Sequence, residues 1–173
     1  MITIFISTNR PGSYSERVSL WVKKSLAVRG VSAQILSLEH LPEDFAYRKI
    51  RKENLPEFDA LMDEKIGNVD KYIFIIPEYN GSYPGILKTL IDSVPPRLFY
   101  NKKAALIGLS SGRSGALRAL DDFTSVLHHL QVEVLSDKPK LAAVESMIDE
   151  NAVISNADVV TRLDRHLDKF LTF

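Results

Sequence analysis

Short apolar runs alternate with longer amphipathic stretches along the whole chain. The apolar runs predict five strands, at Ile2–Ser7, Val31–Leu38, Lys71–Ile76, Lys103–Leu109 and Val132–Leu135. The stretches with apolar residues at helical spacing predict five helices, at Glu16–Arg29, Pro56–Ile66, Pro84 to the Pro95-Pro96 pair, Gly115–His129 and Val153–Leu171. This alternation is typical of βαβ units arranged around a parallel sheet.

Connection rules and two unusual segments suggest how the strands are ordered. Lys71–Ile76 is apolar on both predicted faces, which is typical of a central strand in a parallel sheet, whereas Glu39–Leu55 is highly charged and predicts a surface excursion. Right-handed crossovers then favour an α/β flavodoxin-like, doubly wound sandwich: a five-stranded parallel sheet of order 2-1-3-4-5 with helices on both faces. The pattern alone leaves other doubly wound orders open. In the flavodoxin-like order, ligands bind beyond the carboxyl ends of strands one and three.

Length and charge point to one domain that acts on a small molecule. The chain has 173 residues, enough for a single domain with a substantial core, so residues 1–173 are expected to form one unit. Lysine and arginine total 22, and so do aspartate and glutamate. Because no net charge favours nucleic acid or an anionic membrane surface, the expected partner is a small molecule, with no nucleic acid and no membrane.

The composition also excludes several kinds of chemistry. The chain has no cysteine, which excludes disulfides and thiolate catalysis and is compatible with a reducing compartment. His40, His128, His129 and His166 show no ligand-like spacing, so no metal site is predicted. The start of the chain does not resemble a secretory signal, and no run has transmembrane length. We therefore expect a cytoplasmic protein.

The loop after the first predicted strand gathers polar groups at the start of a helix. The residues able to surround an anion there are Thr8, Arg10, Gly12, Ser13 and Ser15. Because a helix N-terminus offers unpaired amides and a positive dipole end, we expect a phosphate at this loop. A simpler alternative is that Ser13 or Ser15 only caps the helix. The loop lacks both the Walker lysine and Gly-x-Gly-x-x-Gly, which disfavours an NTPase and an NAD-binding turn and favours a phosphate that is held rather than transferred.

The loop after the third predicted strand carries the most specific motif. Residues 77–92 read Pro-Glu-Tyr-Asn-Gly-Ser-Tyr-Pro-Gly-Ile-Leu-Lys-Thr-Leu-Ile-Asp, which resembles the signature segment of the NAD(P)H-dependent FMN reductase family. The resemblance implies that the isoalloxazine ring of FMN is lined by Pro77, Glu78, Tyr79, Asn80 and Gly81. Such a ring suits an aromatic side chain, an amide and a glycine that permits close approach. Simple packing of Tyr79 and Tyr83 at the sheet edge is the alternative.

The loop after the fourth predicted strand reads Ser110-Ser111-Gly112-Arg113-Ser114-Gly115 and again opens a helix. The family resemblance places a glycine-rich turn against the flavin here. It implies that the ring is approached by Ser111, Gly112, Arg113 and Ser114. The family often has a glycine pair where this chain has Ser114-Gly115, and it usually has Gly-Ser-x-Arg where this chain has Ser7-Thr8-Asn9-Arg10.

A rival motif overlaps the third loop. Residues 108–112 satisfy Gly-x-Ser-x-Gly between a predicted strand and a predicted helix, the context of a serine hydrolase nucleophile. The triad would be Ser110, Asp149 or Asp158, and His166. However, His166 falls in a predicted helix rather than in a loop after a strand, and a hydrolase leaves the other two loops unexplained. The hydrolase is therefore the weaker hypothesis.

Two charged features have simpler structural interpretations. Residues 48–52, Arg-Lys-Ile-Arg-Lys, could meet the phosphates of a nicotinamide cofactor or a neighbouring subunit, but a solvated charged loop explains them as well. Lys88 and Asp92 are four residues apart on a predicted helix, so an intrahelical ion pair is expected rather than a catalytic pair.

The resemblance implies an enzyme, an NAD(P)H-dependent FMN reductase with FMN as cofactor and NADPH or NADH as co-substrate. Hydride would pass from NAD(P)H to flavin N5 and on to a small acceptor: free flavin, a quinone, an azo compound or a metal oxyanion. No side-chain acid or base is required, so no catalytic residue is assigned. Family members commonly form homodimers or homotetramers. An acidic flavodoxin-type electron carrier, which the balanced charge disfavours, and a non-catalytic nucleotide-binding module stay open as alternatives.

Overall fold

A parallel sheet forms the centre of the protein in a computed structural model that describes residues 1–173. Its first four strands are β1 (Ile2–Ile6), β2 (Ala33–Ser37), β3 (Lys71–Pro77) and β4 (Lys103–Leu109). They are followed by the two-residue strands β5 (Glu133–Val134) and β6 (Lys140–Leu141). The order β2-β1-β3-β4-β5 confirms the flavodoxin-like prediction, and every pairing in the sheet is parallel.

The last position of the sheet is divided between two short strands. β5 pairs with the first two residues of β4, and β6 pairs with its last two. The polar segment 136–139 between them ends at Pro139, which has no N–H to donate but accepts a hydrogen bond from the Gly108 amide at 2.9 Å. The sequence predicted β5 as part of one strand, Val132–Leu135, and missed β6 because two residues are too short to show a period.

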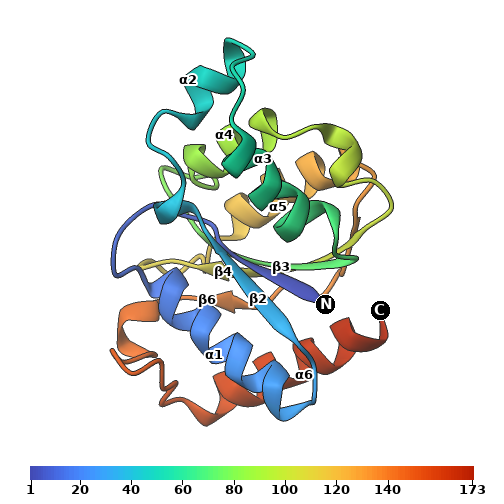
Figure 1. Ribbon diagram of the computed structural model, residues 1–173. Coiled ribbons are helices and arrows are strands. Elements are labelled where there is room, and N and C mark those ends of the chain that lie inside the picture. The colour runs from blue at the N-terminus through green and yellow to red at the C-terminus, as the bar shows by residue number, and fades with distance from the viewer.

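Helices cover both faces of the sheet, as Figure 1 shows. On one face lie α1 (Tyr14–Val28) and α6 (Ala157–Thr172). On the other lie α2 (Phe45–Ile50), α3 (Pro56–Met62), α4 (Gly85–Ser93) and α5 (Leu117–His129). Short turns of other helical types lie at Leu38–His40, Asp63–Gly67, Pro96–Leu98 and Val144–Ser146. None of the helices has the length and apolar character that a membrane span requires.

The alternation of side chains along the central strands builds two cores. On β1, Ile4 packs with the α1 and α6 layer, while Phe5 packs with the opposite layer. Phe5 stacks on Phe74 of β3 at 4.2 Å between ring centroids, and Phe74 meets Phe123 of α5 edge to face at 4.9 Å. Because the central strands are buried on both faces, they read as continuous apolar runs in the sequence.

The predicted excursion at Glu39–Leu55 contains more structure than expected. It includes the helix α2, whose Phe45 is buried and stacks on Phe58 of α3 at 5.3 Å. Two of its basic residues form ion pairs, Arg48 with Glu53 and Lys49 with Asp59. The predicted helix Pro56–Ile66 is α3 followed by a π-helical turn.

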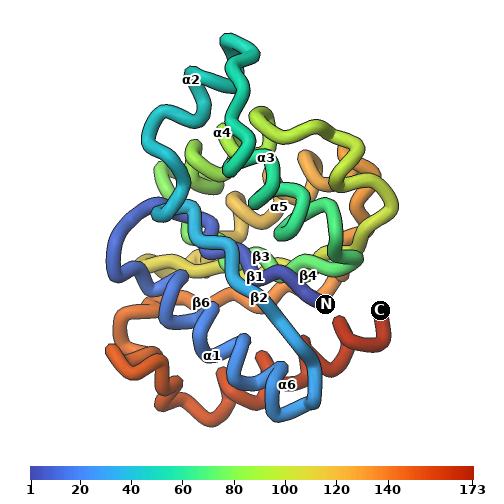
Figure 2. The backbone as a smooth tube through the Cα atoms, viewed as in Figure 1, coloured from blue at the N-terminus to red at the C-terminus, as the bar shows by residue number.

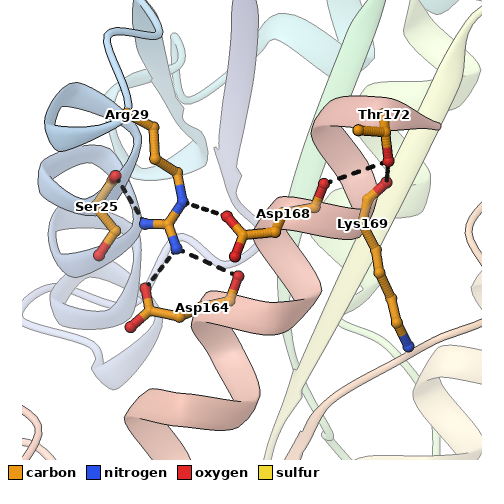
Figure 3. Close-up of polar contacts among 6 residues, drawn as sticks. All are labelled: Ser25, Arg29, Asp164, Asp168, Lys169 and Thr172. Carbon is orange, nitrogen blue, oxygen red and sulfur yellow. Dashed lines mark hydrogen bonds and ion pairs between the residues drawn. The ribbon is translucent and has the colours of Figure 1, made fainter.

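The two chain ends lie close together at the amino edge of the sheet, as the trace in Figure 2 shows. There Arg29, which ends α1, reaches across to α6. Its guanidinium donates to Asp168 at 2.7 Å, to Asp164 at 2.9 Å and to the Ser25 carbonyl at 3.0 Å (Figure 3). The hydrogen bond to Asp168 raises the pKa of Arg29. Lys71, at the start of β3, donates to the carbonyls of Phe170 and Leu171 at the end of α6.

Candidate functional site

The loops that follow β1, β3 and β4 meet at the carboxyl edge of the sheet and enclose a cleft of about 170 Å³. Eight of the residues singled out from the sequence line it: Arg10, Gly12, Ser13, Ser15, Pro77, Glu78, Tyr79 and Ser111. The other six lie outside its lining: Thr8, Asn80, Gly81, Gly112, Arg113 and Ser114. The cleft is also lined by five residues to which the sequence assigned no part in a cofactor site: Tyr14, Leu109, Ser110, Val144 and Glu145.

The first loop ends in a capped helix with a spare hydroxyl beside the cap. Ser13 is the N-cap of α1, and its Oγ accepts a hydrogen bond from the Glu16 amide at 3.2 Å. Ser13 therefore caps the helix as an acceptor, and the cap does not use its hydroxyl hydrogen. Ser15 differs, because its Oγ is buried and has no hydrogen-bond partner. An unpaired buried hydroxyl costs about 1–3 kcal/mol, so its place in a cleft is favourable once a ligand supplies the partner.

Tyr79 connects the first loop to the second. Its hydroxyl lies 2.9 Å from Thr8 Oγ1, and the Arg10 guanidinium lies over its ring, 4.9 Å from the centroid. Thr8 Oγ1 also accepts the Arg10 amide at 3.2 Å. Thr8 is fully buried outside the cleft lining, and its hydroxyl joins the two loops. Arg10 keeps its charge exposed at the rim, within reach of an anion.

The second loop contains a tight turn. Tyr79 and Ser82 exchange two backbone hydrogen bonds, at 2.8 and 3.1 Å, and the turn between them consists of Asn80 and Gly81. Both turn residues have positive φ, +52° and +83°, as a type I′ turn requires. Asn-Gly is the pair best suited to this conformation, so the local sequence explains the local backbone.

Glu78 supplies a second unpaired group inside the cleft. Its amide donates to the Leu109 carbonyl at 3.0 Å, which fixes the start of the loop against β4. Its carboxylate oxygen Oε2 is buried and has no hydrogen-bond partner. A buried carboxylate oxygen requires a donor, so this wall of the cleft is complementary to an N–H or O–H of a ligand.

The third loop is held in place by hydrogen bonds within the loop and by hydrogen bonds from the segment after β6. Ser110 Oγ donates to the Gly112 carbonyl at 2.8 Å and accepts the Gly115 amide at 2.9 Å. The segment after β6 lies under this loop, because the amides of Ala143 and Val144 donate to the carbonyls of Gly112 and Ser110 at 3.2 Å each. This support brings Val144 and Glu145 into the cleft, a consequence of the divided fifth strand that no motif indicated.

The structure does not assemble the serine hydrolase triad. Ser110 Oγ is engaged within its own loop, and His166 lies on α6 with 0% exposure, its Nδ1 3.9 Å from Asp137. Burial lowers the pKa of His166 to about 4. Asp149 accepts the amides of Asn151 and Val153 in its own turn. No base is therefore placed to activate Ser110.

The cleft has the donors and acceptors that FMN requires. The start of α1 and the free Ser15 hydroxyl suit a phosphate, and the unpaired Glu78 oxygen suits a ligand N–H or hydroxyl. The cleft lies at the carboxyl edge beside β1 and β3, where flavodoxin-like sheets bind ligands. Among residues 1–173, no group of three or more histidine, aspartate and glutamate side chains is arranged to hold a metal ion.

Comparisons with known proteins identify the family. Residues 1–143 match the family model described as NADPH-dependent FMN reductase. A 2-hydroxy-1,4-benzoquinone reductase of a Burkholderia species is 28% identical over 98% of this chain and 93% of its own. An NAD(P)H-dependent FMN reductase of Pseudomonas aeruginosa is 33% identical over 76% of this chain and 71% of its own. The solved structure of the Paracoccus denitrificans flavoenzyme FerB, an NAD(P)H:(acceptor) oxidoreductase, shares the fold, with a TM-score of 0.79 at 23% identity over 99% of this chain and 94% of that one. The chain belongs to the NADPH-dependent FMN reductase family, and it is an FMN-using, NAD(P)H-dependent oxidoreductase.

Proposed function

We propose that the cleft at the carboxyl edge holds FMN and that the enzyme reduces small acceptors, quinones first among them. The observation that carries the site is the pair of buried, unpartnered polar atoms in one cleft, Ser15 Oγ and Glu78 Oε2. Family membership supports the cofactor, and one relative that aligns over nearly the whole chain is named for a hydroxybenzoquinone.

The first loop binds the phosphate in this proposal. Ser15 Oγ and Ser13 Oγ can each donate one hydrogen bond, and Gly12 leaves open space where a side chain would stand. The amides at the start of α1 add further donors, and the positive end of its dipole favours an anion. Arg10 at the rim supplies the countercharge.

The second and third loops hold the ring. The Asn80-Gly81 turn and Tyr79 approach it from the β3 side, with Pro77 and Glu78 at the base of the loop. The β4 side contributes Ser111, Gly112, Arg113 and Ser114. Bound FMN supplies the capacity to accept a hydride and pass two electrons on. The protein holds the ring rigidly, leaves one face open to small flat molecules, and keeps donors fixed at its edge.

Spectroscopy and turnover test the proposal together. The purified chain is loaded with FMN, desalted and reduced anaerobically with NADPH or NADH, and then a benzoquinone, an azo dye, free FMN and chromate are supplied in turn. We expect retained flavin bands that bleach with the nicotinamide and return fastest with the quinone. Absence of retained flavin would overturn the site. Faster return with another acceptor would overturn only the quinone preference.

We also propose that the chain forms a homodimer or homotetramer. A groove of about 530 Å³ between α4 and α5 has an apolar lining, in which Val126 is partly exposed and Ile91, Val94 and Leu130 are largely buried. Burying such a surface against a second copy would remove it from water. Light scattering coupled to gel filtration gives the mass, and a mass of one chain would contradict the proposal. A cytoplasmic location stays a prediction, which cell fractionation tests.

A further inference from the structure

The loop that follows β3 is tied to α5 by contacts that lie outside the cleft. Ser82 Oγ donates to Asp122 Oδ2 at 2.6 Å. The residues that follow these two also make contact. The ring of Tyr83 packs edge to face on the ring of Phe123, with 5.1 Å between their centroids. Phe123 is fully buried and belongs to the core, so α5 gives this loop a rigid anchor.

These contacts fix one end of the Asn80-Gly81 turn, and the first loop fixes the other. Ser82 closes the turn by its backbone bonds to Tyr79, and Tyr79 is held by its hydroxyl to Thr8 at 2.9 Å. The Asn-Gly pair favours the positive φ of both turn residues, but this local preference does not fix where the turn lies relative to the cleft. A turn of two residues therefore depends on what holds its ends.

The first two turns of α5 face this loop with charged groups. Asp122 accepts from Ser82, and a Cβ placed on Gly81 would lie 3.7 Å from Nη1 of Arg118, one helical turn earlier. A hydrogen bond to a carboxylate is about twice as strong as one between neutral groups. The neighbouring Asp121 is exposed and its side chain makes no hydrogen bond or ion pair, so the helix also contains a matched aspartate without this contact.

We propose that Asp122 is a positioning residue, which acts through Ser82 to hold the Asn80-Gly81 turn in the conformation that contacts the flavin ring. The inference rests on the proposed function, since it assumes that this turn meets the ring. Its consequence is specific to the ring. Loss of the hydrogen bond between Ser82 and Asp122, the tether, should weaken the binding of riboflavin and of FMN by the same factor, because the phosphate subsite in the first loop is unchanged.

The experiment titrates the apoprotein with FMN and with riboflavin and follows flavin fluorescence. The variants are Asp122→Ala, Ser82→Ala, their double variant, Ser82→Thr and the control Asp121→Asn. We expect each alanine variant to weaken both ligands about tenfold, the scale of one charge-assisted hydrogen bond. The double variant should be no weaker than either single one, because both remove one interaction. Ser82→Thr should retain binding, and Asp121→Asn should bind as the unmodified protein does.

Two results would overturn the tether. One is an Asp122→Ala protein that binds both flavins as well as Asp121→Asn does, and the other is a double variant whose losses are the product of the single ones. Thermal unfolding of the apoproteins identifies misfolded variants, and the partly exposed Ser82 gives the decisive result if Asp122→Ala does not fold. Failure of the proposed function has a different signature, because the unmodified protein would then bind neither flavin.

Discussion

Polar groups are paired at the amino edge of the sheet, whereas two buried ones are unpaired at the carboxyl edge. At the amino edge, Arg29 donates to two aspartates of α6, and Lys71 of β3 donates to two carbonyls of α6, so these contacts join neighbouring elements. At the carboxyl edge, Ser15 Oγ and Glu78 Oε2 are buried without partners. Since folding alone favours paired polar groups, the contrast separates contacts that serve the fold from groups that await a ligand.

His166 is the strongest challenge to this comparison, because it is buried without a hydrogen-bond partner yet lies outside the cleft. Burial lowers its pKa from 6.5 to about 4, and Lys169 adds to the effect while Asp137 opposes it. Between these values the unfolded chain binds the proton and the folded chain does not. The contribution of His166 to stability is therefore complete above pH 6.5, and up to about 3 kcal/mol is lost as the pH falls toward 4.

Urea unfolding at several pH values between 7.5 and 4 measures this loss. Carboxylates also titrate in that range, so the informative quantity is the difference from His166→Leu, which cannot bind the proton. We expect the variant to lose less stability on acidification than the unmodified protein. Equal pH dependence in the two proteins would show that His166 is not the source of the acid sensitivity.

Ser15→Ala gives the next largest effect and sharpens the comparison directly. The substitution should weaken FMN binding about 10- to 100-fold, the range for a hydrogen bond to a charged group, and leave riboflavin binding unchanged. The apoprotein should be as stable as before or more so, because an unpaired buried hydroxyl is removed. The control is Ser19→Ala, one turn later on α1, whose hydroxyl is paired with the Ser15 carbonyl. Ser19→Ala should lower the stability of the protein and leave its FMN affinity unchanged. Loss of FMN affinity in Ser19→Ala and not in Ser15→Ala would contradict the assignment of the phosphate site.

Arg29→Ala should show the opposite behaviour at the amino edge. We expect a loss of about 1–2 kcal/mol in the free energy of unfolding, since Asp164 and Asp168 are partly exposed and their ion pairs are screened by water. FMN affinity should stay within about twofold, because the contact joins α1 to α6 far from the loops. Arg29→Lys keeps the charge without the planar fork, so it should recover only part of the stability. A large loss of FMN affinity would mean that the two edges are coupled.

The sequence predicted the sheet well because its signals are local. The runs at β1, β3 and β4 are apolar on both faces, and the Asn80-Gly81 pair predicts its own turn chemistry. It did not show β6, whose two residues pair with β4 only in the folded sheet. Val144 and Glu145 enter the cleft through that pairing, so no local pattern could reveal them. The pairing of Ser82 with Asp122 spans 40 residues and is invisible for the same reason.

Ser110→Ala should have the smallest effect, and it tests the serine hydrolase hypothesis. Its hydroxyl bridges Gly112 and Gly115 across the third loop, so the variant should lose about 1 kcal/mol of stability and bind FMN only a few times more weakly. Turnover with saturating FMN should stay within about threefold, because the loop is still held by the backbone bonds of Ala143 and Val144. Ser111→Ala, the adjacent hydroxyl in the cleft, is the matched control. The opposite result would be complete loss of turnover in Ser110→Ala but not in Ser111→Ala, together with an esterase activity in the unmodified protein. It would mean that Ser110 reacts as a nucleophile rather than shaping the loop.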